Sequence, residues 1–251
     1  MLNILVPIAG KGRRFIEAGY KLPKPLIPIN GKPMLYIVIN NIKPNIEHKF
    51  IFLVLKEHII NYGIENYLKN CVSNCEIIVV DKVTEGAACT VLLAKEFINN
   101  DNPLMIANGD QWVDIDINDY LKYMEVSNSD GLIMTMWADH PKWSYVRINE
   151  SGKITEVVEK EVVSNEATVG IYNYKKGIFF VEAAEKMIAE NLRVNNEFYV
   201  APAYNKMIEK GMRISIYNIG KEYDGMYGLG IPADVVKFEN LIISKKATNF
   251  L

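Results

Sequence analysis

The chain has 251 residues, and its 28 Lys and Arg against 30 Asp and Glu give a formal net charge of −2 at pH 7. Hydrophobic residues make up 49% and charged residues 23% of the chain, proportions that exclude a disordered, collagen-like or low-complexity protein. A protein dedicated to binding nucleic acid would carry a basic surplus, so the balanced charge argues against that class.

No segment approaches the roughly 18 to 20 continuous apolar residues that span a bilayer. The first residues, Met1–Pro7, lack the basic region and the small-residue cleavage site of a signal peptide. Cys71, Cys75 and Cys89 are too few and too irregularly spaced for a disulfide framework, and are interpreted as free thiols. We therefore expect a cytoplasmic protein without a membrane or nucleic-acid partner. Whether it forms a homo-oligomer stays open.

The first half of the chain alternates short apolar runs with helical patterns. Strands are predicted at Leu2–Pro7, Phe50–Leu55, Glu76–Val80 and Pro103–Ala107. Apolar residues at spacings of 4, 3 and 4 predict one helix face, made of Ala87, Val91, Ala94 and Ile98. Because such alternation is typical of βαβ units, the sequence predicts an α/β fold with a mostly parallel, Rossmann-like mixed sheet flanked by helices.

From Asp130 onward the pattern changes to closely spaced strands. These are predicted at Gly131–Trp137, Tyr145–Ile148, Ile154–Val158 and Thr168–Tyr174, with a hairpin turn at Ser151-Gly152. The remaining predictions are helices at Gly177–Glu190 and Glu197–Lys210, a strand at Arg213–Tyr217 and a helix that begins at Pro232. No flexible linker separates the halves. We therefore expect one domain over residues 1–251 with two sub-regions, residues 1–129 and residues 130–251, the second of which adds a smaller antiparallel extension.

The stretch Ala9–Phe15 follows the first predicted strand and is rich in glycine and cations. Glycines allow the backbone to approach a ligand closely, and free N–H groups after a parallel strand form an anion cradle. The stretch is not a dinucleotide fingerprint, because Phe15 occupies the place of the third glycine. Arg14, together with Lys24 in the motif Pro23–Pro25, supplies more positive charge than a turn needs. A solvated basic loop is the alternative interpretation.

Gly-x-Gly-x-Arg followed by Pro-Lys-Pro resembles the signature of the sugar-phosphate nucleotidylyltransferases, or pyrophosphorylases, of bacterial capsule pathways. Further motifs of that family follow in order along nearly the whole chain, at Thr84–Ala88, Ala107–Asp110, Val157–Lys160, Ala167–Tyr172 and Gly228–Pro232. The resemblance implies transfer of a nucleotidyl group from a nucleoside triphosphate to a phosphorylated small-molecule acceptor, with release of pyrophosphate. Within the family, the chain resembles the cytidylyltransferases that join CTP to phosphoglutamine in capsular phosphoramidate synthesis.

The resemblance also implies that residues 1–129 form the nucleotide-binding part and residues 130–251 the acceptor-binding part, and it implies roles for individual residues. Arg14, Lys24 and Lys160 are the expected catalytic side chains, the first two on the triphosphate and the third on the acceptor phosphate. The nucleotide is expected to contact Ala9, Gly10, Gly12, Arg13, Asp81, Glu85, Gly86 and Asn108. The acceptor is expected to contact Glu159, Gly170 and Glu197. Many family members carry Ser or Thr at the position of Arg13, so this chain departs from the pattern by adding a cation to the loop.

Asp110 is the candidate ligand for Mg²⁺, with Mn²⁺ as a substitute. It follows a predicted buried strand, and carboxylates at the carboxyl ends of parallel strands lie where open α/β sheets bind ligands. Mg²⁺ takes one or two carboxylates together with phosphate oxygens. Family members often carry a second metal-binding aspartate where this chain has Gly228, so the nearby Asp224 is the candidate second ligand.

The residue at position 81 bears on the choice of base. Pyrimidine-using relatives carry a glutamine there, five residues before the glycine that matches Gly86, whereas this chain has Asp81. An ionised aspartate can only accept hydrogen bonds, and cytosine offers an amino donor where uracil and thymine offer a carbonyl. CTP is therefore the favoured nucleotide. Guanine also offers donors, and a solvated Asp81 is the alternative.

Three other functions stay open. The first is a sugar-1-phosphate nucleotidylyltransferase that uses UTP, dTTP or GTP. The second is a nucleotide-sugar-dependent glycosyltransferase, for which Asp114-Ile115-Asp116 matches the Asp-x-Asp metal motif, although Asp116 is also a natural helix N-cap. The third is a catalytically silent binding module. Trp137, Trp143 and Tyr145 are candidates for an acceptor wall, with core packing as the alternative for each.

Overall fold

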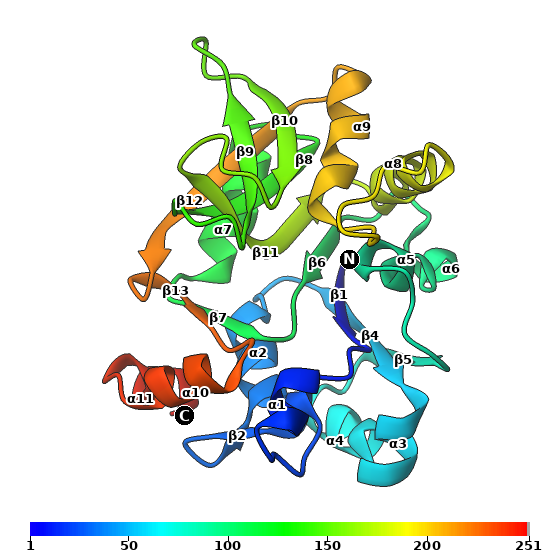
Figure 1. Ribbon diagram of the computed structural model, residues 1–251. Helices are drawn as coiled ribbons and strands as arrows, with labels where there is room; N and C mark the ends of the chain where they lie inside the picture. The colour runs from blue at the N-terminus through cyan, green and yellow to red at the C-terminus, as the bar shows by residue number, and fades with distance from the viewer. Residues whose placement is uncertain (250–251) are drawn as a thin grey trace.

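The computed structural model describes residues 1–249. Its centre is one mixed sheet of 11 strands, with the order β5-β4-β1-β6-β11-β8-β12-β13-β7 along its main path and with β9 and β10 attached through β11 (Figure 1). A separate small sheet pairs β2 (Pro28–Ile29) with β3 (Lys32–Pro33). The prediction of a Rossmann-like mixed sheet flanked by helices is confirmed.

The first half of the chain forms a parallel sheet in which three of the four strands are buried on both faces and the edge strand is partly exposed. Its strands are β1 (Leu2–Ile8), β4 (His48–Leu55), β5 (Cys75–Val80) and β6 (Leu104–Ala107). Successive side chains of a strand point to opposite faces, so Leu5 packs in one hydrophobic cluster while Ile4 and Val6 pack in another. Burial on both faces explains why these strands are continuous apolar runs in the sequence.

Helices cover the two faces and one end of this sheet (Figure 1). One face packs against α2 (Met34–Ile42), α3 (Lys56–Tyr62), α4 (Ile64–Cys71) and α7 (Ile117–Val126). The other packs against α5 (Ala87–Leu92), α6 (Lys95–Ile98), α8 (Gly177–Ala189) and α9 (Tyr204–Glu209). A third cluster joins α1 (Arg13–Glu17), α10 (Pro232–Glu239) and α11 (Ile243–Thr248). Within residues 1–249, every helix is too short or too polar to cross a membrane.

The second half continues the same sheet with antiparallel and parallel pairings. β11 (Glu166–Tyr174) lies antiparallel between β6 and β8 (Gly131–Trp137). β9 (Ser144–Ile148) and β10 (Ile154–Glu159) form a hairpin around the predicted turn at Ser151-Gly152. The main path ends with β12 (Ile214–Glu222), β13 (Gly225–Gly228) and β7 (Gln111–Val113). The predicted antiparallel extension is formed by β8, β9, β10 and β11, whereas β12 runs parallel to both β8 and β13.

Two helix predictions are wrong in their extent. The helix expected over Ala87–Ile98 is two short helices, α5 and α6. The helix expected at Glu197–Lys210 begins only at Tyr204, after a 3₁₀ turn at Ala201–Ala203. For the second helix the cause is a tertiary contact, because Phe198 N donates to Glu85 O at 2.9 Å and Phe198 O accepts from Ala88 N at 2.9 Å. These hydrogen bonds between distant segments of the chain keep Phe198 out of a helix and override the local preference for one.

The pairing at Phe198 predicts a strict requirement for glycine at position 86. Gly86 has a φ of +135°, and a β-carbon there would lie 2.4 Å from both N and O of Phe198. Because backbone atoms cannot move aside, we expect Gly86→Ala to lower the free energy of unfolding by about 2 kcal/mol or more, measured by urea denaturation.

Gly152→Ala is the matched control for this measurement. Gly152 also has a positive φ, of +78°, but no atom lies within 4 Å of its added β-carbon, so the cost should be only about 1 kcal/mol. Equal stability of the two variants would show that the contact with Phe198 is not the constraint.

Candidate active site

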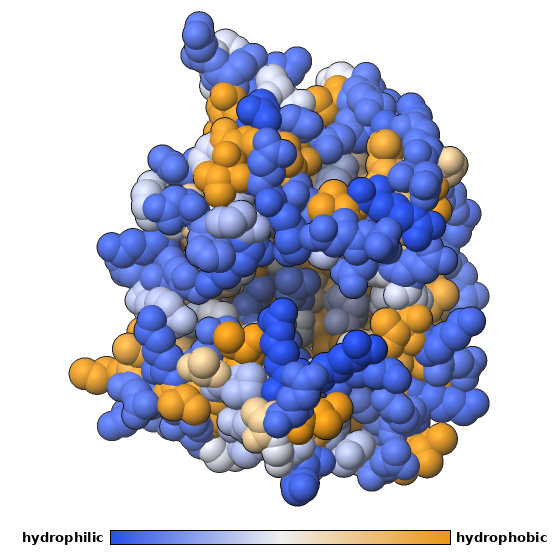
Figure 2. All heavy atoms as spheres, in the orientation of Figure 1, coloured by the Kyte–Doolittle hydropathy of each residue, from blue (hydrophilic) through white to orange (hydrophobic). Residues whose placement is uncertain are grey.

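Two adjoining cavities open where the parallel strands end. The first, the loop cavity, has a volume of about 370 Å³ and lies among the segments that follow β1, β5 and β6. The second, the strand cavity, has a volume of about 630 Å³ and is walled by residues of β10, β11 and β13. Figure 2 shows this face of the molecule hollowed at its centre, with mostly hydrophilic residues around the opening. Ala87, Asn108 and Asp110 line both cavities, so ligands in the two would meet beside Asp110.

The glycine-rich loop lies between β1 and α1, and its shape depends on Gly12. This residue has a φ of +62°, and a β-carbon on it would stand 3.0 Å from Lys24 Cβ. Glycine is needed here because it both adopts the left-handed conformation and leaves room for Lys24. The adjacent Phe15 is buried in the cluster with α10 and fixes the loop to the body of the protein.

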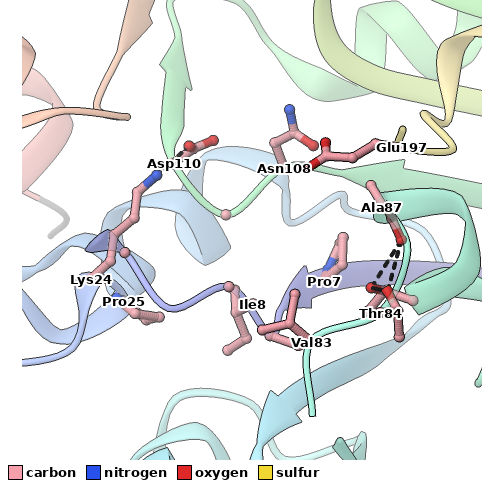
Figure 3. Close-up of a pocket in the computed structure, with 16 residues that line it drawn as sticks. Pro7, Ile8, Lys24, Pro25, Val83, Thr84, Ala87, Asn108, Asp110 and Glu197 are labelled. Atoms are coloured by element: carbon pink, nitrogen blue, oxygen red, sulfur yellow. Dashed lines mark hydrogen bonds and ion pairs between the residues drawn. The ribbon is translucent and has the colours of Figure 1, made fainter. Parts of the chain in front are cut away.

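Lys24 and Asp110 form a close ion pair at the junction of the cavities (Figure 3). Their side chains are 20% and 32% exposed, so both remain accessible to a ligand. The backbone of Asp110 is held because Leu229 N donates to Asp110 O at 2.8 Å, and the preceding Asn108 N donates to Gly170 O at 2.9 Å. The pair therefore offers a cation for an anionic ligand and a carboxylate for a cation.

A second charged group lies in the strand cavity, at the end of β10. The carboxylate of Glu159 is almost fully buried, accepts a hydrogen bond from Ser144 Oγ and pairs with Lys160 Nζ at 3.1 Å. Lys160 has a φ of +60°, which is rare for a residue with a side chain, and its N–H donates to Trp143 O at 3.0 Å. Such backbone strain persists where the surroundings enforce it and is concentrated at functional sites.

Neutral hydrogen-bonding groups complete the wall of the strand cavity. Tyr172 Oη lies 2.9 Å from Thr168 Oγ1, and burial is the main reason that the pKa of Tyr172 is raised, which keeps the phenol protonated. Of the three aromatic candidates, Trp143 lines the cavity. Tyr145 is buried in the core, where its hydroxyl donates to His140 O at 2.8 Å, and Trp137 is half exposed outside both cavities.

Most residues expected from the sequence lie around these cavities. The loop cavity is lined by Ala9, Gly10, Gly12, Lys24, Gly86, Asn108, Asp110 and Glu197. The strand cavity is lined by Arg14, Asn108, Asp110, Glu159, Lys160 and Gly170. Glu197, expected to contact the acceptor, therefore lies on the side of the loop cavity. Arg13 and Asp81 line neither; they lie in an outer groove of about 650 Å³ that meets the loop cavity at Gly12, Val83 and Glu197.

Several expected residues are not brought to the cavities. Glu85 pairs with Arg193 at 2.6 Å. Asp224 is 77% exposed, faces Lys221 at 3.8 Å and lines neither cavity, because the tight turn between β12 and β13 points it outward. In the Asp-x-Asp sequence, Asp114 pairs with Lys246, and Asp116 caps α7 by accepting from Asn118 N at 2.9 Å.

The sequence analysis missed other residues of the strand cavity, among them Gln111, Lys142, Ser144 and Asp234. Gln111 directly follows Asp110 and was within reach of the same motif. Ser144 and Lys142 belong to a strand end and a turn whose direction only the hairpin of β9 and β10 sets. Asp234 lies in the first turn of α10, and no sequence signal connects it with Asp110.

The residues present suit one kind of metal ion. Among residues 1–249, no group of three or more His, Cys, Asp or Glu side chains converges to enclose a metal. Mg²⁺ does not need such an enclosure, since it is usually bound by one or two carboxylates together with substrate phosphates and water. Asp110, at a strand end and accessible from both cavities, fits this mode of binding.

The cavity beside the glycine-rich loop and the second, charged cavity meet at one carboxylate, that of Asp110. Residues 4–214 match the model of the Nucleotidyl transferase family, and the chain belongs to that family. It is 31% identical to the bifunctional protein GlmU of Methanococcus maripaludis strain C7, over 97% of this chain and 56% of that protein. The chain thus spans about half the length of the first curated relatives that it matches. It is 25% identical to the UTP–glucose-1-phosphate uridylyltransferase AglF of Haloferax volcanii, over 93% of each chain.

Solved structures share the fold. The nucleoside-diphosphate-sugar pyrophosphorylase of Vibrio cholerae RC9 superposes with a TM-score of 0.79 at 22% identity, over 96% of this chain and all of that one. The inositol-1-phosphate CTP transferase of T. maritima superposes with a TM-score of 0.73 at 15% identity, over 98% and 94% of the two chains.

Proposed function

We propose that the protein transfers a nucleotidyl group from a nucleoside triphosphate in the loop cavity to a phosphorylated small molecule in the strand cavity. The observation that carries this proposal is the meeting of the two cavities at Asp110, with Lys24 on one side and Lys160 on the other. Membership of the Nucleotidyl transferase family supports the reaction class. The test is pyrophosphate release with each triphosphate, Mg²⁺ and a panel of phosphorylated acceptors.

The reaction is an in-line displacement at the α-phosphorus. An oxygen of the acceptor phosphate forms the new bond, the bond from the α-phosphorus to the bridging oxygen breaks, and pyrophosphate leaves with the electron pair. Such a transfer depends mainly on positioning and charge neutralisation. Arg14 and Lys24 neutralise the triphosphate, and Lys160 aligns the acceptor phosphate. Asp110 holds Mg²⁺, which neutralises phosphate charge when it is bound.

We further propose CTP as the nucleotide and phosphoglutamine as the acceptor, in the cytoplasmic supply of a capsule precursor. The support for CTP is the carboxylate of Asp81, which is 78% exposed in the outer groove and lies 3.2 Å from Lys56 Nζ. The support for a phosphorylated amino acid is a strand cavity that carries both ammonium and carboxylate groups. A glycosyltransferase is disfavoured, because the Asp-x-Asp carboxylates lie away from both cavities.

We expect Lys24→Ala and Arg14→Ala each to lower turnover by at least about 10²-fold in the pyrophosphate assay, because each removes a cation from the place where charge develops on the leaving group. Lys21→Ala, in an exposed part of the same loop and outside both cavities, is the control and should retain wild-type turnover. Near-normal turnover of either variant, with unchanged melting, would exclude that side chain from the mechanism.

We expect activity to require Mg²⁺ or Mn²⁺, and Asp110→Asn to abolish the response to added metal, because the carboxylate is the protein's ligand. Mn²⁺ binding, followed by electron paramagnetic resonance in the presence of the triphosphate, should weaken in parallel. Asp224→Asn should match the wild type, since that carboxylate faces solvent. An Asp110→Asn variant with an ordinary metal titration would refute the assignment.

We expect CTP to be the best substrate in a comparison of CTP, UTP, dTTP, GTP and ATP, and Asp81→Gln to shift the preference toward UTP and dTTP. The reason is that a glutamine amide donates to the carbonyl of those bases, which a carboxylate repels. Preference of the wild type for UTP or dTTP would overturn the assignment of cytosine. Preference for GTP would keep the carboxylate as reader and change the base.

A further inference from the structure

The charged side chains of the strand cavity are mostly paired with one another. Three ion pairs join Lys24 to Asp110, Lys142 to Glu222 at 2.7 Å, and Lys160 to Glu159 at 3.1 Å. Within residues 1–249, two charged side chains of the lining have no ion-pair partner: the guanidinium of Arg14 and the carboxylate of Asp234. A ligand that matches the cavity therefore brings one negative and one positive group.

Asp234 lies in the first turn of α10, directly after β13 (Figure 1). Its Oδ1 accepts a long hydrogen bond of 3.4 Å from Tyr223 Oη. Its Oδ2 lies 3.6 Å from the point where a β-carbon on Gly228 would stand. Because glycine carries no side chain, the space beside Oδ2 stays open to the cavity. Across the same strand end, a β-carbon on Gly230 would lie 3.3 Å from Asp110 Oδ2, so the two carboxylates flank one short stretch of backbone.

Within residues 1–249, no cation forms an ion pair with Asp234. The carboxylate is half-buried, and loss of water is the main reason that its pKa is raised. Lys142 lowers the pKa of Asp234 in part, but its ammonium group pairs with Glu222 and lies 4.7 Å from the centre of the Trp143 ring. A carboxylate withdrawn from water is destabilised unless a cation or a strong donor replaces the lost hydration. In this cavity, a bound ligand can supply the cation that the carboxylate of Asp234 needs.

We propose that Asp234 selects the acceptor by binding a protonated amine on it, so that the true acceptor carries an ammonium group as well as its phosphate. This inference rests on the proposed function of the cavity. The phosphate of the acceptor lies toward Lys160, and the amine lies toward α10. A sugar phosphate without an amine would leave Asp234 without a counter-ion. The presence or absence of the amine should therefore change the affinity for the acceptor rather than the rate of the chemical step.

The experiment compares matched acceptors that differ only in the amine. Phosphoethanolamine is paired with 2-hydroxyethyl phosphate, and glucosamine-1-phosphate with glucose-1-phosphate, each tested with Mg²⁺ and the preferred triphosphate. We expect the amine-bearing member of a pair to have at least about tenfold higher kcat/KM, since an ion-paired hydrogen bond is worth about that factor or more. Equal use of both members, or preference for the neutral one, overturns the inference while leaving the proposed function intact.

The variant Asp234→Asn then assigns the selectivity to this side chain. We expect KM for the amine-bearing acceptor to rise at least about tenfold, with kcat and the KM for the triphosphate nearly unchanged, and with no change for the neutral acceptor. Calorimetry of acceptor binding should show the same loss. Asp119→Asn, an exposed aspartate in the first turn of α7, is the matched control for removing a charge from a helix start.

Three results overturn the assignment. In the first, Asp234→Asn weakens both members of a pair equally. In the second, it shifts the Mg²⁺ titration instead of the acceptor KM, which would make Asp234 a metal ligand. In the third, no acceptor of either kind, phosphoglutamine included, binds or leads to pyrophosphate release with any triphosphate, which refutes the proposed function and the inference with it.

Discussion

The site depends on the antiparallel pairing of β11 with β6. This pairing sets Ile171 opposite Ala107 and lets Gly170 O accept from Asn108 N, so that the second half of the chain is joined to the first at the end of the central strand. Without it, the loop cavity and the strand cavity would belong to separate surfaces. The hydrogen bonds between these two strands therefore determine where Asp110 lies relative to both ligand sites.

Opposite charges within the site neutralise one another in the protein alone. Lys24 holds Asp110, Lys160 holds Glu159, and Lys142 holds Glu222. In the proposed reaction, a phosphate group would take the place of Asp110 beside Lys24, and a metal ion would take the place of Lys24 beside Asp110. Such an exchange would keep both of these side chains compensated, which limits the cost of holding them out of water.

Local patterns predicted the strands of the parallel half well, since a strand buried on both faces has to be a continuous apolar run. They failed where distant backbone intervened. The expected helix at Glu197–Lys210 is extended at Phe198, because the hydrogen bonds to Glu85 and Ala88 stabilise the chain more than a helical turn would. That failure matters for the site, since the extended segment carries Glu197 to the loop cavity and Tyr199 to the strand cavity.

The sequence by itself determined the class of fold, the glycine-rich loop with the nearby cations Arg14 and Lys24, and the carboxylate of Asp110 at a strand end. Each depends on residues that are neighbours in the chain, where spacing alone carries the physical information. Only the tertiary structure decided which carboxylates from more distant parts of the chain lie in the same cavities as these residues. Asp224 is closer in sequence to the motif at Gly228 but points to solvent, whereas Asp234 reaches the cavity because α10 turns back across the end of β13. The direction in which a side chain points across a turn depends on packing against other elements, and no local pattern encodes it.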